Sequence, residues 1–332
     1  MCWGILSYRD IQFIRLASDG SASSVQRRDI RSARKMERIP ADSGTITPHA
    51  HPTSAMTDSD WGDWLPRAVA DADPDTVALW YLGCNGFAIK GSEGTVLWID
   101  PYAGTGDPPR TIRMIPVPFD PDDIDEADAV LATHEHTDHV HGPSQAPILA
   151  NTDADFVAPD DSLAVAREEE RWTENWGVDD EAFLEVAEGD ELKIGEFTVH
   201  VVETQDADAT HPVGYVIEHD SGTLFHAGDS KPSESFPALA DEFDIDLGIL
   251  AFGSIGRVPD KETGEPVETK WYSDENEIAA AAEDLALDRL VPTHWDMWKG
   301  LTADPTALHE HVRSRSHPNR LEIVEIGDRI DL

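Results

Sequence analysis

Short apolar segments recur along the chain from about residue 77 to the C-terminus, and polar, charged or glycine-containing stretches separate them. Brief runs rich in β-branched and aromatic side chains, bounded by such stretches, predict β-strands. We therefore expect strands at 77–82, 87–89, 96–99, 129–133, 197–202, 213–217, 224–226, 247–251, 290–291 and 321–324.

Three of the intervening stretches have helical composition: 162–172, 275–287 and 305–312. Ser273 and Asp274 precede the second of them and are candidate N-caps, because their side-chain oxygens can accept from the first free backbone N–H groups. Strands with interspersed helices indicate a layered α/β or α+β protein.

The most informative polar stretch is His134-Glu135-His136-Thr137-Asp138-His139, which directly follows the apolar run 129–132. Imidazoles and a carboxylate at the end of a strand are a ligand mix that suits borderline metals such as zinc. Residues two apart in an extended segment point the same way, so His134 and His136 can share one ion. Asp138 and His139 can then turn toward a second. The alternative reading of this stretch is a solvated polar loop.

Two later strand ends can complete such a centre. Asp229 follows Gly228 after the predicted strand 224–226, and His294 follows the strand at 290–291. Taken alone, each is more typical of a turn carboxylate or a surface histidine. Together with the first motif they favour metal binding.

The charge is strongly acidic, with 66 Asp and Glu against 25 Lys and Arg and a formal net charge of -41. Such a surface repels nucleic acid and anionic membranes, so we expect neither as a partner. It also suggests a halophilic source, because concentrated salt screens the self-repulsion. Cys2 and Cys84 are too few for a disulfide framework, and no apolar run approaches a membrane span. We expect a cytoplasmic protein.

The first 55 residues differ from the rest. They hold 8 basic and 5 acidic side chains, which leaves 17 basic and 61 acidic ones, a net -44, for residues 56–332. We expect 1–55 to be a disordered tail or the product of a start codon placed too early, with Met56 as the true start; a transit peptide is a further possibility. Residues 56–332 are expected to form one large domain.

The motif His134-x-His136-x-Asp138-His139, followed by Gly228-Asp229 and His294 in this order, resembles the metallo-β-lactamase superfamily. Within it, the chain is more similar to the L-ascorbate-6-phosphate lactonase family. The segments that carry this second resemblance are Trp61-Gly62-Asp63-Trp64-Leu65, Trp80-Tyr81-Leu82-Gly83-Cys84-Asn85-Gly86, Leu131-Ala132-Thr133-His134, Leu224-Phe225-His226-Ala227-Gly228-Asp229-Ser230 and His294-Trp295-Asp296-Met297-Trp298. The chain departs from the lactonases between Val258 and Tyr272. The implied fold is α+β, a four-layer αββα sandwich with the metals at one edge.

The resemblance also implies a ligand arrangement for two divalent ions. Asp229 would bridge them, with His134 and His136 on one ion and with Asp138, His139 and His294 on the other. Where the superfamily usually supplies a further histidine, this chain has Gln205-Asp206, and the lactonases have an Asp near that place. We therefore expect Asp206 to be a ligand, and a harder site that favours manganese over zinc. Asp100 matches the aspartate that holds the ligand loop; a plain strand-end carboxylate is the alternative.

The function implied by this resemblance is metal-dependent hydrolysis. A metal-bound hydroxide would open a lactone or similar ester of a small anionic metabolite, and Asp138 would help to move the proton, with Asp229 as the other catalytic carboxylate. Arg257 and Lys261 are candidates to hold the anionic group, and His211 is expected to face the substrate. The alternatives are a small-molecule phosphodiesterase and a metal-binding protein without catalysis. No pattern indicates the oligomeric state.

Overall fold

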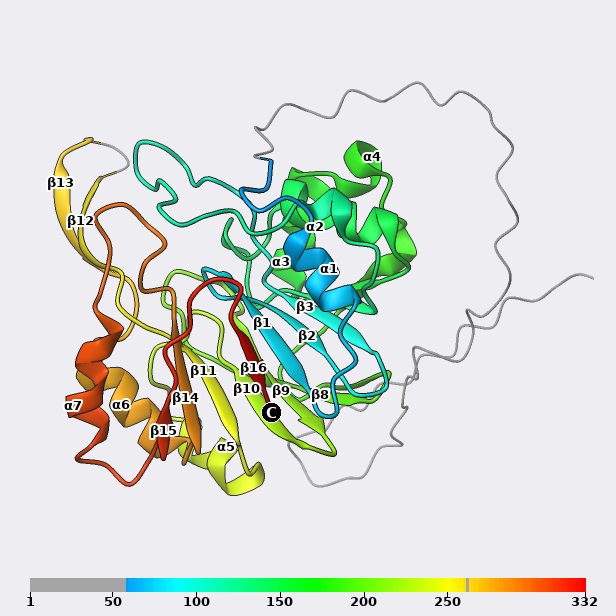
Figure 1. Ribbon diagram of the computed structural model, residues 1–332. Coiled ribbons are helices and arrows are strands. Elements are labelled where there is room, and N and C mark those ends of the chain that lie inside the picture. Colours follow the sequence, from blue (N-terminus) through cyan, green and yellow to red (C-terminus); the bar gives the residue numbers. More distant parts are fainter. Residues whose placement is uncertain (1–57, 261–262) are drawn as a thin grey trace, which may run out of the picture.

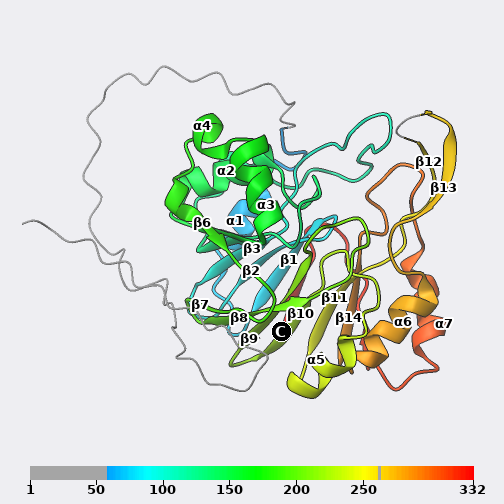
Figure 2. The same ribbon diagram turned by 180° about the vertical axis from the view of Figure 1, so that it is seen from behind.

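The computed structural model describes residues 58–260 and 263–332, so the predicted segment 1–55 lies outside the described residues. Two seven-stranded sheets form its centre (Figures 1 and 2). The order in the first sheet is β16 (Arg329–Asp331), β1 (Ala78–Gly83), β2 (Gly86–Lys90), β3 (Val96–Ile99), β4 (Ala129–Leu131), β5 (Asp155–Ala158) and β6 (Phe183–Glu185). The order in the second is β15 (Arg320–Leu321), β14 (Arg289–Thr293), β11 (Leu247–Ala251), β10 (Gly222–His226), β9 (Val213–His219), β8 (Phe197–Glu203) and β7 (Glu191–Ile194). A separate hairpin joins β12 (Ile255–Pro259) to β13 (Pro266–Lys270).

Helices lie on the two outer sides of this pair of sheets (Figure 1). One set is α1 (Trp64–Ala70), α2 (Gly142–Asn151), α3 (Asp160–Ala164), a π-helical turn (Val165–Glu169) and α4 (Trp172–Trp176). The other set is α5 (Phe236–Glu242), α6 (Glu275–Asp284) and α7 (Leu308–Val312). Short 3₁₀ turns cover Pro121–Asp123, Asp180–Ala182 and Pro305–Ala307. The four layers are therefore helix, sheet, sheet and helix.

Successive side chains along a strand pack into different apolar clusters, and this alternation produces the layers. In β1, Leu79 and Tyr81 belong to the apolar cluster between the sheets, whereas Trp80 and Leu82 belong to the cluster beneath the first set of helices. Successive side chains of a strand point to opposite faces, so a strand that is apolar at every position must be covered on both sides. The predicted α+β class and αββα sandwich are confirmed.

Each predicted strand overlaps an observed strand, although 321–324 shares only Leu321 with β15. Strands β5, β6, β7, β12, β13 and β16 were not predicted. One predicted helix is wrong in its extent. The stretch 162–172 is divided into α3, the π-helical turn and α4, because Arg171 takes a left-handed conformation with φ of 56° directly before α4. Helix α2 was not predicted, since Pro147 lies inside it and prolines ordinarily indicate a break. Helix α6 begins as expected at Asp274, whose side chain accepts from the backbone N–H groups of Asn276 and Glu277.

Strand directions bring several strand ends to one edge. In the first sheet β1 and β3 are both antiparallel to β2, and β4 is parallel to β3, so β1, β3 and β4 end on the same side. In the second sheet β8 and β10 are both antiparallel to β9, and β11 and β14 are parallel to β10. Strands β8, β10, β11 and β14 therefore end on the same side. The segments after these strands hold the residues of the site described below.

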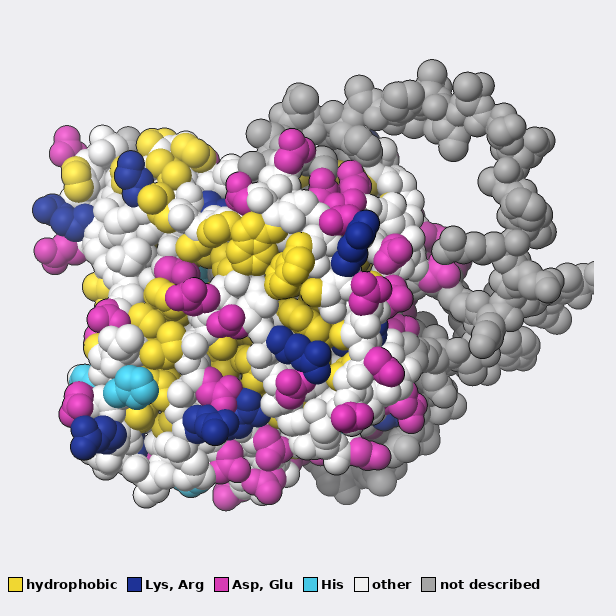
Figure 3. Space-filling view, in the orientation of Figure 1, with side chains coloured by type: hydrophobic (Ala, Val, Ile, Leu, Met, Phe, Trp, Pro, Cys, Tyr) yellow, Lys and Arg dark blue, Asp and Glu magenta, His cyan; other side chains and the backbone are white. Residues whose placement is uncertain are grey.

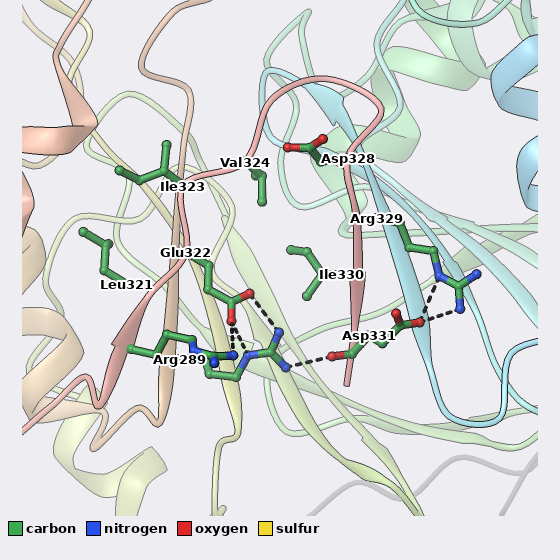
Figure 4. Close-up of a pocket in the computed structure, with 10 residues that line it drawn as sticks. Arg289, Leu321, Glu322, Ile323, Val324, Asp328, Arg329, Ile330 and Asp331 are labelled. Carbon is green, nitrogen blue, oxygen red and sulfur yellow. Dashed lines mark hydrogen bonds and ion pairs between the residues drawn. The ribbon is translucent and has the colours of Figure 1, made fainter.

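Arg289 and the C-terminal segment connect the two sheets at a shallow groove (Figure 4). Arg289 of β14 makes two hydrogen bonds with the carboxylate of Glu322, at 2.9 and 2.8 Å, and donates to the backbone oxygen of Asp331 in β16 at 2.9 Å. Because β14 and β16 belong to different sheets, this arginine links them. The residues of this groove do not overlap with those of the cavity described below.

Acidic side chains are spread over the face shown in Figure 3, with fewer Lys and Arg among them. Within residues 58–260 and 263–332, no helix is both long enough and apolar enough to cross a membrane.

Candidate metal centre

Asp100, which directly follows β3, anchors the loop after β4 by hydrogen bonds. One carboxylate oxygen of Asp100 accepts from the backbone N–H of Thr133 at 2.9 Å, and the other accepts from the Thr133 hydroxyl at 2.8 Å. The second oxygen also lies 2.8 Å from Nδ1 of His139. Asp100 is fully buried and has φ of 45°, a conformation that non-glycine residues adopt rarely. These contacts orient the His139 ring, as a carboxylate behind a metal-binding histidine commonly does.

The first group of candidate ligands is His134, His136, Asp206 and Asp229, whose ligand atoms all lie within 4.8 Å of one another. Nε2 of His134 is 2.9 Å from Nδ1 of His136. The Oδ2 atom of Asp206 lies 3.5 Å from Nε2 of His134 and 3.4 Å from Nδ1 of His136. Asp206 follows β8, so it reaches the loop of the other sheet only because the sheets are stacked.

The second group is Cys84, Asp138, His139 and His294, again with all ligand atoms within 4.8 Å of one another. Nε2 of His294 is 3.4 Å from Oδ2 of Asp138 and 3.2 Å from Sγ of Cys84. Cys84 follows β1 and His294 follows β14, so this group also combines strand ends of both sheets.

Asp229 lies between the two groups. Its Oδ2 atom is 3.8 Å from Nε2 of His134 and 3.1 Å from Nε2 of His139, while its Oδ1 atom is 3.4 Å from Nε2 of His294. The side-chain amide of Asn85 donates to Oδ1 at 3.2 Å. Asp229 therefore stands where a bridging carboxylate would stand.

The carboxylates of the centre are ionised, and they favour positive charge on the groups that they face. Burial would raise the pKa of Asp229, but the imidazoles of His139 and His294 hold it well below its usual range. Burial would lower the pKa of His139, but the carboxylates of Asp229 and Asp100 raise it well above its usual range. Burial lowers the pKa of His134 to about 3, so this imidazole is neutral and available as a ligand at neutral pH.

The residues present fit divalent ions. Nε2 of His139 is buried at the meeting point of Asp138 and Asp229 and has no hydrogen-bond partner in the described part of the chain. A buried polar atom without a partner is costly, and a cation at this point would satisfy it. Imidazole and carboxylate donors are the ligands of borderline to hard divalent metals.

A cavity of about 480 Å³ opens beside the two groups. Five carboxylates line it: Asp107, Asp138, Asp206, Asp208 and Asp229. Arg110 is the only Lys or Arg among its described lining residues. The Arg110 guanidinium lies over the Trp271 ring, 5.7 Å from its centroid, and its Nε atom is buried without a hydrogen-bond partner in the described residues.

Two residues that we expected to bind substrate lie elsewhere. The side chain of His211 is 66% exposed and contacts Asp161 through Nδ1 at 2.6 Å, and it does not line the cavity. Arg257 is exposed on the β12–β13 hairpin, where it donates to the backbone oxygen of Pro266. Their positions in the structure therefore do not support the predicted role, because neither side chain reaches the cavity. Lys261 lies outside the described residues.

Sequence reasoning missed four residues of the site: Cys84, Asn85, Arg110 and Tyr272. Cys84 and Asn85 belong to the segment 80–86, and their place just after a predicted strand is a signal that could have found them. Tyr272 lies directly after Trp271, and its hydroxyl is 3.1 Å from Nε2 of His294. Arg110 stands in an irregular loop with no periodic pattern, so no local signal distinguishes it from a surface cation.

The stacked sheets and the His and Asp groups at their shared edge define a protein of the metallo-β-lactamase fold with clusters suited to divalent metals. Residues 95–295 match the model of the beta-lactamase superfamily domain, which is more than half of the chain. The chain belongs to this superfamily, and the expected resemblance is confirmed.

Curated relatives support the same assignment. The chain is 28% identical over 294 residues to a probable L-ascorbate-6-phosphate lactonase, UlaG, of Salmonella gallinarum, which covers 75% of this chain and 78% of the relative. It is 28% identical over 295 residues to the protein of the same description from Escherichia fergusonii, with the same coverage.

Solved structures share the fold at lower identity. Igni18, a metallo hydrolase from Ignicoccus hospitalis, matches with a TM-score of 0.56 and 18% identity over 77% of this chain and 98% of its own. An isothiocyanate hydrolase from Delia radicum gut bacteria matches with a TM-score of 0.58 and 17% identity over 77% of this chain and 99% of its own.

We predict that Asp206→Ala removes one metal equivalent and that His211→Ala retains both. Oδ2 of Asp206 lies within 3.5 Å of both imidazoles of the first group, whereas His211 is exposed and contacts an aspartate outside the cavity. Metal content of the purified variants, measured by mass spectrometry, checks this. Loss of metal on changing His211, with Asp206→Ala still fully loaded, would reverse the assignment.

Proposed function

We propose that the protein hydrolyses a lactone or similar ester of a small anionic metabolite, using a centre of two divalent ions, manganese or zinc. The observation that carries the proposal is the meeting of two ligand groups at Asp229, beside a cavity that holds a single arginine. The relatives described as probable L-ascorbate-6-phosphate lactonases support a substrate that combines a lactone with an anionic group.

Divalent ions bound by these residues would lower the pKa of a water toward about 7 and would polarise the oxygen of the substrate. The ligands proposed are His134, His136 and Asp206 on one side, Asp138, His139 and His294 on the other, and Asp229 between them. Asp100 positions His139 from behind.

Asp138 lies in place to relay a proton and is ionised, but its lowered pKa makes it a weak base. Burial would raise the pKa of its carboxyl, but His139 and His294 lower it well below its usual range, so the group is ionised at neutral pH. It lines the cavity, and its Oδ2 atom faces Nε2 of His294 at 3.4 Å. A carboxylate in this place can take the proton of the attacking water and transfer it to the leaving oxygen.

Tyr272 is suited to donate a hydrogen bond to the reacting oxygen. Burial first, and then the neighbouring carboxylates Asp229 and Asp138, raise the pKa of its hydroxyl well above the usual range. It therefore stays protonated at the wall of the cavity. A fixed donor at the position where negative charge develops stabilises the transition state.

Arg110 is suited to hold the anionic group of the substrate. A planar guanidinium can form paired hydrogen bonds with carboxylate and phosphate, and that of Arg110 lies over the Trp271 ring. The other charged side chains that line the cavity are carboxylates. Arg110 is therefore the residue that would attract an anionic group bound away from the metals.

The test is a turnover assay of full-length, metal-loaded protein with phosphorylated lactones, neutral lactones and small phosphodiesters. We expect the phosphorylated lactones to have the highest kcat/KM. Turnover of phosphodiesters alone would favour the phosphodiesterase alternative. Bound metal without turnover of any ester would contradict the proposal and leave a metal-binding protein.

We predict that Arg110→Ala raises KM for an anionic lactone by about 10- to 150-fold, since a hydrogen bond to a charged group contributes about 1.5–3 kcal/mol. The KM for a neutral lactone should change little. Arg257→Ala is the matched control, because that arginine is exposed on the hairpin and should leave both values unchanged. Steady-state kinetics with the two lactones decides, and an equal rise for both would rule out anion recognition by Arg110.

A further inference from the structure

Cys84 is the one residue of the two ligand groups that neither the motif nor the resemblance assigns. It is fully buried and directly follows β1. Its Sγ atom lies 3.2 Å from Nε2 of His294 and 3.4 Å from Oδ2 of Asp138. The sulfur is therefore directed into the second ligand group.

The backbone holds Cys84 in an unusual conformation. Its φ is 58°, in the left-handed region that is costly for residues other than glycine. The carbonyl of Cys84 accepts from the hydroxyl of Tyr81 and from the backbone N–H of His294, each at 3.0 Å. These two bonds fix the turn after β1 and with it the direction of the thiol.

A second observation at the same place points to a bound cation. Nε2 of His139, in the same group, is fully buried and makes no hydrogen bond of good geometry among the described residues, although Oδ2 of Asp229 lies 3.1 Å away. A thiol packed only as a small apolar side chain would leave this nitrogen unsatisfied. A cation surrounded by the sulfur, the two imidazoles and the Asp138 carboxylate would satisfy all of them.

We propose that Cys84 is a ligand of the second metal position, together with Asp138, His139 and His294. On binding, the S–H bond breaks, a metal–sulfur bond forms and the proton leaves to solvent. The inference rests on the metal centre of the proposed function but not on hydrolysis.

The two metal positions then differ in chemistry. The first has nitrogen and oxygen donors from His134, His136, Asp206 and Asp229, a set that accepts manganese as well as zinc. The second adds a soft thiolate, which selects zinc or cobalt over manganese. We therefore expect a centre that takes one zinc and one manganese when both are offered.

The experiment replaces the native metals with Co²⁺ in the full-length protein. We expect a thiolate-to-cobalt charge-transfer band in the near-ultraviolet in the wild type and in Cys2→Ser, and no such band in Cys84→Ser. Cys2 is the matched control, because it is the only other cysteine of the chain. Cobalt content is measured in parallel so that the band is normalised to bound metal.

A second measurement does not depend on a folded variant. X-ray absorption of the wild-type protein loaded with Zn²⁺ should contain one sulfur neighbour at about 2.3 Å. Absence of this neighbour, or of the band with both cobalt equivalents bound, would overturn the proposal, as would a band of equal strength in Cys84→Ser. A protein with the sulfur contact but no ester turnover would contradict the hydrolase function and leave the role of Cys84 standing.

Discussion

Replacing Asp229 by alanine is expected to reduce kcat/KM on the order of a thousandfold or more, and to leave the far-ultraviolet circular dichroism unchanged in high salt. Asp229 contacts His134 and His139 through one oxygen and His294 through the other, so its loss separates the two ligand groups. It follows β10 in a loop and adds no apolar surface to the core. The fall in kcat/KM should therefore come from loss of metal and of charge stabilisation. These two contributions supply much of the rate enhancement in such centres.

The same loss is expected of His134→Ala, whose ring lies in the first ligand group. Asp160→Ala is the control, because Asp160 is an exposed carboxylate in the separate group with Asp161 and His211. Kinetics and metal content are measured on the same samples. Near-native turnover by either variant of the centre would show that the reaction occurs elsewhere.

Lowering the salt concentration is expected to unfold or inactivate the protein. Residues 56–332 carry a net charge of -44, and acidic side chains are spread over the face in Figure 3. At 1 M salt the Debye length is about 3 Å, so these charges hardly interact, whereas at 0.01 M it grows to about 30 Å and spans most of a domain. Repulsion within the folded state then rises over the whole surface.

The measurement is circular dichroism and activity along a series of KCl concentrations at saturating metal. Saturating metal separates the effect of charge repulsion from simple loss of the ions. Full activity and an unchanged spectrum in dilute buffer would mean that the acidic surface is not an adaptation to salt.

The sequence by itself determined ten of the sixteen described strands and the loop that carries most of the metal chemistry. Residues 129–139 contain an apolar strand followed by four ligand-type side chains, and both the strand period and the ligand spacing are local properties that a short segment encodes. The αββα fold was implied by the resemblance of this motif to the metallo-β-lactamase superfamily, and the strand pattern agrees with it. Strands apolar at every position, such as β1, must be covered on both faces.

The resemblance already pointed to Asp206, Asp229 and His294 as partners of that loop, and only the tertiary structure added Cys84 and Arg110. Cys84 and His294 are 210 residues apart and meet because β1 and β14 of different sheets end at one edge. The same stacking brings Arg110 to the cavity and leaves His211 and Arg257 outside it. Loop residues carry no period that records their direction, and their place depends on packing between elements that are far apart in the chain.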